Sequence, residues 1–225
     1  MKTAKQSVEL LDWCGDDLSV VNAARVSFSK QSSWTDTDTI CMELPEKDAK
    51  LIKYLAKHKH KSPFNHCFMS FRVKAPIFVA RQLVKHEYLP WNEVSRRYVS
   101  DEPEVYFPSE GWRQAAENVK QGSGGLLVDQ GSQIEIAKMT TQYALDAYYT
   151  LMKNGVCPEQ ARMVLPQNTM TEWIWSGTLF AFAKMCKLRL DPHTQKETQE
   201  IAKMIDGEAK VQYPVSWEAL MEYGE

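Results

Sequence analysis

The stretch APIFVARQLVKHEYLPWNEVSRRY, at residues 75–98, organises the rest of the chain around it. Pro76 suits the first position of a helix, because its missing N–H would have no partner there anyway. Apolar residues then recur at helical spacing and predict a buried face: Ile77, Phe78, Ala80, Leu83 and Val84. Pro90 cannot extend a helix and biases Leu89 away from the helical conformation. The pattern therefore predicts a helix that breaks after His86, followed by a polar loop.

This polar loop is a candidate anion-binding site. It contains Asn92, Glu93, Ser95, Arg96 and Arg97 within a few positions of one another. A serine hydroxyl and the planar fork of an arginine both match the oxygens of a phosphate group. An exposed loop that carries ordinary surface charges is the alternative interpretation.

Length and composition are those of an ordinary globular protein. The 225 residues allow one large domain, and 44% hydrophobic and 25% charged residues are typical values. The net charge of −2 argues against general binding to nucleic acids or membrane surfaces. No apolar run approaches the ~20 residues of a membrane span, and the start of the sequence does not resemble a signal peptide. Five scattered cysteines without a C-x-x-C pair predict reduced thiols in a cytoplasmic protein.

The first third of the chain predicts strands and helices in alternation. Residues 8–12 predict a strand, and Asp17 is the candidate cap of the helix that follows. A polar loop is expected over residues 29–44, and Pro45 then begins a second helix. Alternating apolar residues at positions 67–73 predict a strand with one buried face.

The remainder predicts one further sheet region and several helices. Two short strands are expected near Tyr98-Val99 and at residues 105–107. Residues 109–133 are glycine-rich but lack the spacing of a phosphate-binding loop, so we expect a mobile surface loop, with an active-site lid as the alternative. A strand at residues 169–176 and four helices complete the pattern, the helices lying at residues 133–153, 159–165, 178–188 and 196–210. These elements predict one domain of the α/β (α+β) class over residues 1–225.

Three histidines lie close together in the sequence before the predicted strand at residues 67–73. His58, His60 and His66 could in principle hold a metal ion. Zinc sites favour more regular patterns, however, and no cysteine or acidic ligand lies at a suitable spacing. We therefore interpret these residues as histidines that make hydrogen bonds beside a turn, and we predict no metal site.

The quoted stretch resembles the signature of the flavin-dependent thymidylate synthases. That signature reads Arg-His-Arg, seven residues, Ser, one residue, Arg; here it is Lys85-His86-Glu87, seven residues, Ser95-Arg96-Arg97. The blocks VELLDWCGDDLSVVNAARVSF, KHKHKSPFNH, ARMVLP and LRLDPHTQ also resemble the family, in its order. The resemblance covers the chain except for roughly residues 29–48 and 109–133. It implies a single domain with a mixed, largely antiparallel sheet flanked by helices, and a homotetramer whose active sites are built from several subunits.

The resemblance also implies a reaction and a substrate site. A one-carbon unit would pass from methylenetetrahydrofolate to C5 of dUMP, with FAD, reduced by NADPH, supplying a hydride. The residues implied for dUMP are Gln82, Lys85, Glu93, Val94, Ser95, Arg96, Arg97, Arg162 and Arg189. Because arginine forks neutralise phosphate and can polarise a pyrimidine carbonyl, Arg97, Arg162 and Arg189 are expected to converge on one mononucleotide. The catalytic candidates are Arg189, Ser95 and His60, with Ser95 a substrate ligand rather than a nucleophile because no adjacent base is evident.

The residues implied for FAD match the family less closely. They are His60, Ser62, Asn65, Lys85, His86, Glu87, Tyr88, Thr178, Lys184, Leu188 and His193. Lys85 and Glu87 replace two signature arginines, and Asn65, Thr178 and Lys184 also depart from the family pattern. A carboxylate in place of an arginine near a pyrophosphate should cost ~1–3 kcal/mol if it is partly desolvated and uncompensated.

This uneven match leaves two alternative functions open. One is a flavin-independent or altered folate-linked transfer to a pyrimidine deoxynucleotide, such as 5-hydroxymethylation, which needs no hydride. The other is a catalytically silent homologue that binds a nucleotide. The sequence also leaves open whether the base is uracil or cytosine.

Overall fold

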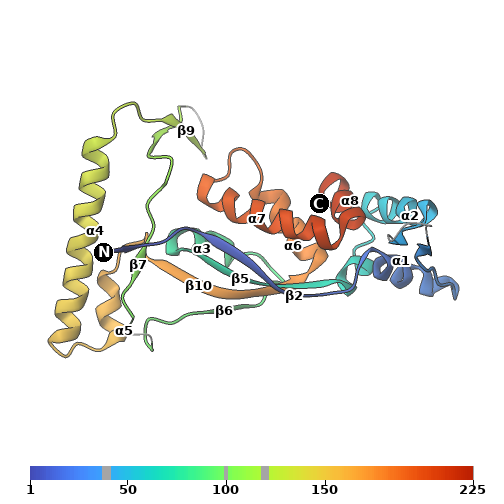
Figure 1. The fold of residues 1–225 in the computed structure, drawn as a ribbon, viewed down its shortest axis with the longest axis horizontal. Helices are drawn as coiled ribbons and strands as arrows, with labels where there is room; N and C mark the ends of the chain where they lie inside the picture. Colours follow the sequence, from blue (N-terminus) through green and yellow to red (C-terminus); the bar gives the residue numbers. More distant parts are fainter. Residues whose placement is uncertain (37–41, 99–100, 118–121, 225) are drawn as a thin grey trace.

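A four-stranded antiparallel sheet forms the centre of the protein. The computed structural model describes residues 1–36, 42–98, 101–117 and 122–224. The strand order is β2 (Ser7–Cys14), β5 (Phe68–Pro76), β10 (Met170–Thr178) and β6 (Trp91–Glu93), as Figure 1 shows. The predicted fold class, with its largely antiparallel sheet and flanking helices, is confirmed.

The pairing of β5 with β10 is the longest in the sheet. It runs in unbroken register from Phe68 opposite Thr178 to Pro76 opposite Met170. Side chains alternate along β5 as predicted, with Met69, Phe71 and Val73 fully buried. Burying each large apolar side chain contributes about 1.5–3 kcal/mol to folding, so this pair forms much of the core.

Helices cover one face of the sheet and occupy both of its ends. Over the face lie α3 (Ile77–Leu83), α6 (Leu179–Arg189), α7 (Lys196–Gln212) and α8 (Pro214–Tyr223). At one end are α1 (Asp17–Arg25), α2 (Glu46–Lys57), the 3₁₀ turns η1 (Val26–Phe28) and η2 (Ser62–His66), and the short strands β3 (Thr35–Asp36) and β4 (Met42–Glu43). In the described ranges, no helix combines the length and the apolar character that a membrane crossing requires.

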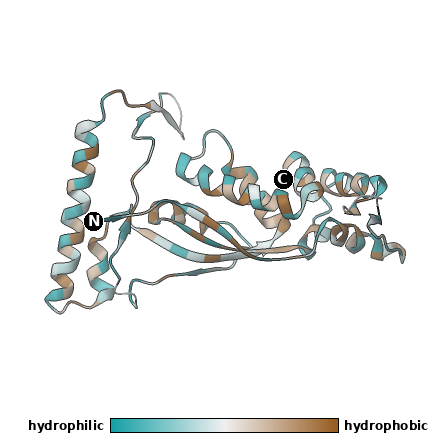
Figure 2. Cartoon of the chain, viewed as in Figure 1, coloured by the Kyte–Doolittle hydropathy of each residue, from teal (hydrophilic) through white to brown (hydrophobic). Residues whose placement is uncertain are grey.

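The opposite end of the molecule carries a long helix that stands beside the sheet. This is α4 (Gly131–Lys153), followed by α5 (Pro158–Ala161) and η3 (Arg162–Val164), at the left of Figure 1. β1 (Lys2–Thr3) pairs in parallel with β7 (Glu104–Val105) close to it, and β8 (Arg113–Ala115) pairs with β9 (Ser123–Leu126) at its upper end. Hydrophobic segments occur along α4 (Figure 2). Among its apolar side chains, Ile136, Met139 and Tyr143 are exposed.

The cap of α1 is Asp16, and the prediction that Asp17 caps this helix is wrong. Asp16 Oδ1 accepts a hydrogen bond from Ser19 N at 2.7 Å, and Ser19 Oγ accepts one from Asp16 N at 3.1 Å. Asp17 is buried and binds the start of α8, where it accepts hydrogen bonds from Val215 N at 2.9 Å and Ser216 N at 2.8 Å. No helix was expected after residue 210, so this long-range role of Asp17 could not be anticipated.

Three loop predictions also differ from the structure. The polar loop at residues 29–44 contains the short strands β3 and β4, and residues 109–133 contain the β8–β9 hairpin. Tyr98 lies in a turn rather than a strand, and its predicted strand partner Val99 falls outside the described residues. The loop that carries the signature residues, at positions 87–98, is called the signature loop; it instead contributes β6, which pairs with β10.

Replacing Asp17 by asparagine should destabilise the fold. An amide side chain has one acceptor atom where the carboxylate has two, so either Val215 N or Ser216 N loses its partner at the buried start of α8. We expect the free energy of unfolding, measured by urea denaturation, to fall by about 1–2 kcal/mol in Asp17→Asn. The matched control is Asp12→Asn, because exposed Asp12 accepts one bond, from Trp13 N, that asparagine can retain. Equal stability of the two variants would contradict this role of Asp17.

Candidate functional site

The signature loop is held in place by β10. Pro90 O accepts a hydrogen bond from Ser176 N at 3.2 Å, and Val94 N donates one to Glu172 O at 2.9 Å. The loop also passes very close to Gly177, where any side chain would collide with Leu89. Glycine at this position therefore lets the loop lie against the central strand, and this contact determines where the loop residues that follow can reach.

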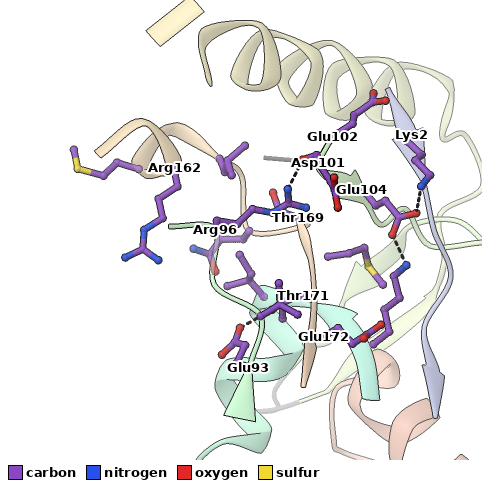
Figure 3. Close-up of a pocket in the computed structure, with 17 residues that line it drawn as sticks. Lys2, Glu93, Arg96, Asp101, Glu102, Glu104, Arg162, Thr169, Thr171 and Glu172 are labelled. Atoms are coloured by element: carbon purple, nitrogen blue, oxygen red, sulfur yellow. Dashed lines mark hydrogen bonds and ion pairs between the residues drawn. The ribbon is translucent and has the colours of Figure 1, made fainter. Parts of the chain in front are cut away.

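The first group of predicted substrate residues surrounds a cavity of about 470 Å³ beside η3. We call it the acidic cavity, because four glutamates and one aspartate line it, together with two lysines and two arginines. Its walls include Glu93, Val94, Arg96, Glu104, Arg162, Thr169 and Thr171 (Figure 3). The signature loop, η3 and the start of β10 thus place four predicted dUMP residues around one cavity.

Some cations of the acidic cavity form ion pairs with a carboxylate, and others do not. Glu104 is bound by both Lys2, at 2.9 Å, and Lys74, and these two lysines lower its pKa. Arg96 instead donates to the Asp101 main-chain oxygen, and Arg162 donates to the Glu159 main-chain oxygen. Because these two guanidinium groups bind neutral carbonyls, their charge remains available to an anion.

Two polar side chains in the acidic cavity are positioned for a ligand. Glu93 accepts hydrogen bonds from Thr171 Oγ1 at 2.6 Å and Trp91 Nε1 at 3.1 Å, which fixes its carboxylate in one orientation. Thr169 is 1% exposed, and its hydroxyl has no hydrogen-bond partner among the described residues. A buried hydroxyl without a partner is costly, so a ligand that bonds to Thr169 would remove that cost.

Ser95 and Arg97 interact directly with each other beside this cavity. Arg97 Nε donates to Ser95 Oγ at 3.1 Å, and Arg97 Nη1 lies 3.9 Å from Glu159 Oε1 on α5. The Arg97 guanidinium also lies over the Tyr98 ring, 4.9 Å from its centroid. Ser95 and Arg97, both implied for dUMP by the family resemblance, therefore lie together next to the segment that carries Arg162.

The second group of predicted substrate residues lines a different cavity, of about 410 Å³. We call it the arginine cavity. It is lined by Gln82, Arg113, Gly122, Ser123, Arg189, His193, Thr194 and Gln195. Gln82 comes from the end of α3 and Arg189 from the end of α6, so the two helices meet here at their C-termini.

Arg189 is held by neutral groups. Its Nε donates to His86 Nε2 at 2.9 Å and its Nη2 donates to Gln82 O at 3.4 Å. Burial lowers the pKa of His86 to about 4, and the nearby charges of Arg189 and Lys184 act in the same direction. His86 is therefore neutral near pH 7 and accepts at Nε2, which assigns its proton to Nδ1. Arg189 keeps its positive charge, without a carboxylate partner in the described part of the chain.

Both polar atoms of the Gln82 side-chain amide make hydrogen bonds. Its Nε2 donates to Gln195 Oε1, and its Oε1 accepts from Thr198 Oγ1 at 3.2 Å. Gln195 precedes α7 and Thr198 lies in its first turn. The start of α7 thus determines the position of Gln82, and sequence reasoning did not identify Gln195 or Thr198.

Within one chain, the three arginines do not converge. Arg162 lines the acidic cavity with Arg97 beside it, whereas Arg189 lines the arginine cavity, and the two cavities share no lining residue. Their separation follows from the fold, since the signature loop and η3 lie at one edge of the sheet while α6 ends above its face. The expected convergence of Arg97, Arg162 and Arg189 on one mononucleotide is therefore not present within a single chain.

The residues predicted for the flavin are distributed along α6. At its start, Thr178 caps the helix and donates to Asn65 Oδ1 at 2.8 Å, and Asn65 and Ser62 belong to η2. Next to η2, the His60 ring stacks on Tyr54 with centroids 6.1 Å apart. These residues form one end of a strip of surface along α6 that carries the residues implied for FAD.

The other end of this strip lies beside the arginine cavity. Exposed Lys184 and Leu188 lead along α6 to Arg189, and His193 Nδ1 lies 3.0 Å from Asp191 Oδ1. From the loop after α3, Lys85, Glu87 and Tyr88 are exposed, and Tyr88 adopts a left-handed conformation with φ of 61°. Because the Glu87 side chain is exposed in the single chain, its carboxylate is solvated there. Partial desolvation, the condition for a large electrostatic cost of placing Glu87 near a pyrophosphate, is therefore not met in the single chain.

Arg113 is a charged lining residue that sequence reasoning had no means of finding. It lies on β8, in a segment without periodicity and outside the family resemblance. Its Nη2 donates to both carboxylate oxygens of buried Glu197, at 2.7 and 2.9 Å. Within the described part of the chain, no three His, Cys, Asp or Glu side chains gather as they would around a metal ion.

Comparison with known proteins identifies close similarity over the whole length. A family model described as thymidylate synthase complementing protein matches residues 9–215. A flavin-dependent thymidylate synthase of Thermus thermophilus is 40% identical over 219 residues, covering 97% of this chain and 77% of the relative. That of Kosmotoga olearia is 37% identical over 223 residues, covering 97% and 91%. Among solved structures, the UMP/dUMP methylase PolB from Streptomyces cacaoi bound with 5-Br dUMP is similar, with a TM-score of 0.85, 29% identity, and 100% and 98% coverage.

His86 should stay neutral well below the ordinary range of histidine. Because its folded pKa is lowered to about 4 from 6.5, the unfolded chain takes up a proton in this window that the folded chain does not. The stability that this difference provides is present above pH 6.5 and is lost as pH falls toward 4. An NMR titration, with the His86 signal assigned by its absence in His86→Gln, should show a midpoint near pH 4. In Arg189→Met the midpoint should rise. A midpoint near 6.5 in the unmodified protein would refute the assigned environment.

Proposed function

The chain belongs to the thymidylate synthase complementing proteins, the family of the flavin-dependent thymidylate synthases, and on that premise we propose that it transfers a one-carbon unit from methylenetetrahydrofolate to C5 of dUMP, giving dTMP. The observation that carries the proposal is the state of Arg189. Its guanidinium is half-buried, held by a neutral imidazole and a main-chain oxygen, and lacks a carboxylate partner among the described residues. Such a group is suited to a carbonyl oxygen on which negative charge develops.

The nucleotide is held by residues from two chains of a homotetramer. Each chain carries two half-sites, and a complete site takes one half from each of two chains. One half is Glu93 and Arg162 in the acidic cavity, with Ser95 and Arg97 beside it, and the other is Gln82 with Arg189 in the arginine cavity. The separation of these halves within one chain supports a composite site. The exposed apolar side chains of α4 support assembly, because clusters of this kind usually mark contact surfaces.

Each half of the composite site has its own task. Arg97, Ser95 and Arg162 bind the phosphate, because their donors match its oxygens. The oriented carboxylate of Glu93 accepts a hydrogen bond from a sugar hydroxyl. Arg189 binds a pyrimidine carbonyl and stabilises the negative charge on its oxygen that makes C5 nucleophilic toward the one-carbon unit. Because His86 is a neutral acceptor, it orients Arg189 without reducing its charge.

The exposed donors along α6 fit a flavin dinucleotide. The bond from Thr178 occupies the carbonyl end of the Asn65 amide, so a ligand would meet its NH₂ group. Lys85 and Lys184 offer exposed ammonium groups that suit a pyrophosphate, and His60 and His193 offer ring nitrogens. When bound, FAD that has been reduced by NADPH supplies the hydride that completes the methyl group.

Altered folate-linked transfer without a hydride is the second candidate function. It is favoured by Glu87, which stands in the place of a signature arginine, and by Asn65 and Thr178, which differ from the residues of the family pattern.

The flavin content of the purified protein separates the two functions. Purified protein that is yellow and releases about one FAD per chain on denaturation supports the first function. Colourless protein that cannot be reconstituted excludes it. The mass of the product formed from dUMP and methylenetetrahydrofolate then distinguishes methylation from hydroxymethylation, and parallel reactions with dCMP and UMP define the accepted base and sugar.

Loss of Arg189 should affect catalysis more than substrate binding. Removing one charge-stabilising donor from the reacting group lowers the rate of the chemical step by about 100- to 1,000-fold, so we expect a loss of this size in kcat for Arg189→Met. Arg81→Met is the matched control, because Arg81 is exposed on α3, outside the arginine cavity. Retention of wild-type kcat in Arg189→Met would contradict the catalytic role.

A mixture of two inactive variants should regain activity if the site is composite. Arg97→Ala loses phosphate binding and Arg189→Met loses catalysis, yet in mixed tetramers some sites take intact Arg189 from one chain and intact Arg97 from another. For random mixing about one quarter of the sites are complete. Co-refolded variants should therefore show about a quarter of wild-type activity. No recovery, in tetramers shown to be mixed by mass spectrometry, would mean that the site is not shared between chains.

A further inference from the structure

A series of hydrogen bonds leads into the arginine cavity from the ion pair between Arg113 and Glu197. Gln195 Nε2 donates to Glu197 Oε2 at 3.1 Å, and Gln195 Oε1 accepts from Gln82 Nε2. Gln82 Oε1 in turn accepts from Thr198 Oγ1 at 3.2 Å, and Thr198 is fully buried. We call these five residues the polar relay. It connects β8 and the start of α7 to the end of α3.

Only one end of the polar relay has donor and acceptor roles that cannot be exchanged. A side-chain amide can turn over and a threonine hydroxyl can either donate or accept, whereas a guanidinium only donates and a carboxylate only accepts. Arg113 donates through Nη2 to both oxygens of Glu197, whose side chain is only 6% exposed. Glu197 therefore meets the NH₂ group of Gln195. This contact sets the direction of every hydrogen bond that follows in the relay.

The direction of the polar relay decides which atoms Gln82 offers to a ligand. Gln195 takes one of the two Nε2 hydrogens, and Thr198 fills one acceptor position of Oε1. One N–H and one acceptor position of Gln82 are left, in a fixed order. Gln82 lines the arginine cavity, and its main-chain oxygen accepts from Arg189 Nη2 at 3.4 Å. Under the proposed function, its amide therefore lies beside the base whose carbonyl Arg189 binds.

Uracil and cytosine differ in the order of donor and acceptor along the edge that such an amide reads. Uracil N3 donates and its O4 accepts, whereas cytosine N3 accepts and its 4-amino group donates. Enzymes that act on a base recognise this edge by hydrogen bonds. Because Arg189 holds one carbonyl, the base has a fixed position, and an amide that pairs with one base must turn over to pair with the other. An amide that cannot turn over leaves the wrong base with unpaired polar groups.

We propose that Glu197 is a positioning residue for base selection. It acts through Gln195 to hold the Gln82 amide in the one orientation that pairs with uracil, and cytosine is thereby excluded. Glu197 does not line the arginine cavity itself, so its effect on the base depends on the polar relay. The inference rests on the proposed function for the identity of the base, and it adds the residues that select this base.

Glu197→Gln tests the inference with little change in side-chain shape. A glutamine at this position can donate as well as accept, so the amides of Gln195 and Gln82 become free to turn over. In wild type incubated with FAD, calorimetric titration should show binding of dUMP at least about 100-fold tighter than that of dCMP. In Glu197→Gln this ratio should fall by about tenfold or more. The two nucleotides share sugar and phosphate, so the ratio reports on the base alone.

Glu200→Gln is the matched control for this substitution. Glu200 also lies on α7 and accepts from a glutamine amide, that of Gln6, at 2.8 Å. It is outside the polar relay and lines neither the acidic nor the arginine cavity. The ratio of the two affinities should stay within about twofold of wild type in this control. If Glu197→Gln does not fold, Gln195→Met interrupts the relay at its next member and is judged by the same criteria.

The affinity ratio separates base selection from a structural role of Glu197. A structural role alone would weaken the binding of both nucleotides in parallel, so an unchanged ratio in Glu197→Gln would overturn the inference. Equal affinities of wild type for dUMP and dCMP would also overturn it. Wild type that prefers dCMP would overturn the proposed function and the choice of uracil, while a fall of that preference in Glu197→Gln would still support selection by Glu197. Wild type that binds neither nucleotide would overturn both.

Discussion

The antiparallel pairing of β5 with β10 is the constraint on which the functional geometry depends. Each strand is followed directly by a helix, α3 after β5 and α6 after β10, so the two helices begin at opposite ends of the sheet. The strands span about 30 Å, while helices of 7 and 11 residues extend about 10 and 16 Å. The helices therefore run toward each other and meet at their C-termini. This meeting point places Gln82 and His86 against Arg189.

The cations of the protein differ in whether a carboxylate neutralises them within the fold. Lys2 and Lys74 bind Glu104, and Arg113 binds Glu197, so these cations are neutralised within the fold. Arg189 binds His86 and a main-chain oxygen, and Arg96 and Arg162 bind main-chain oxygens. A buried carboxylate near Arg189 would have cancelled the charge that a substrate requires. A neutral imidazole holds the same geometry while leaving the charge in place.

The family assignment and the departures from the family pattern concern different surfaces. Residues assigned to the nucleotide come from the signature loop, η3 and the helix ends, where the chain resembles the family except at Lys85. The departures at Asn65, Glu87 and Thr178 lie along or near α6, away from the core. Substitutions there change which donors a cofactor would meet without disturbing the core, because Thr178 still caps α6. The departures from the family pattern on the flavin-side surface therefore leave the cap of α6 in place.

The sequence by itself determined the family, the sheet strands β5 and β10, most helices, and the residue types suited to a nucleotide. Such features depend on local periodicity and on short motifs, as in the alternation along β5 or the break after His86. The tertiary structure alone decided that Arg162 and Arg189 line separate cavities, that Asp17 binds α8, and that Arg113 pairs with Glu197. Those contacts join residues far apart in the chain, from 84 positions between Arg113 and Glu197 to 199 between Asp17 and Ser216. Pairing over such distances depends on how the helices and the hairpin pack on the sheet, and no local pattern of residues encodes it.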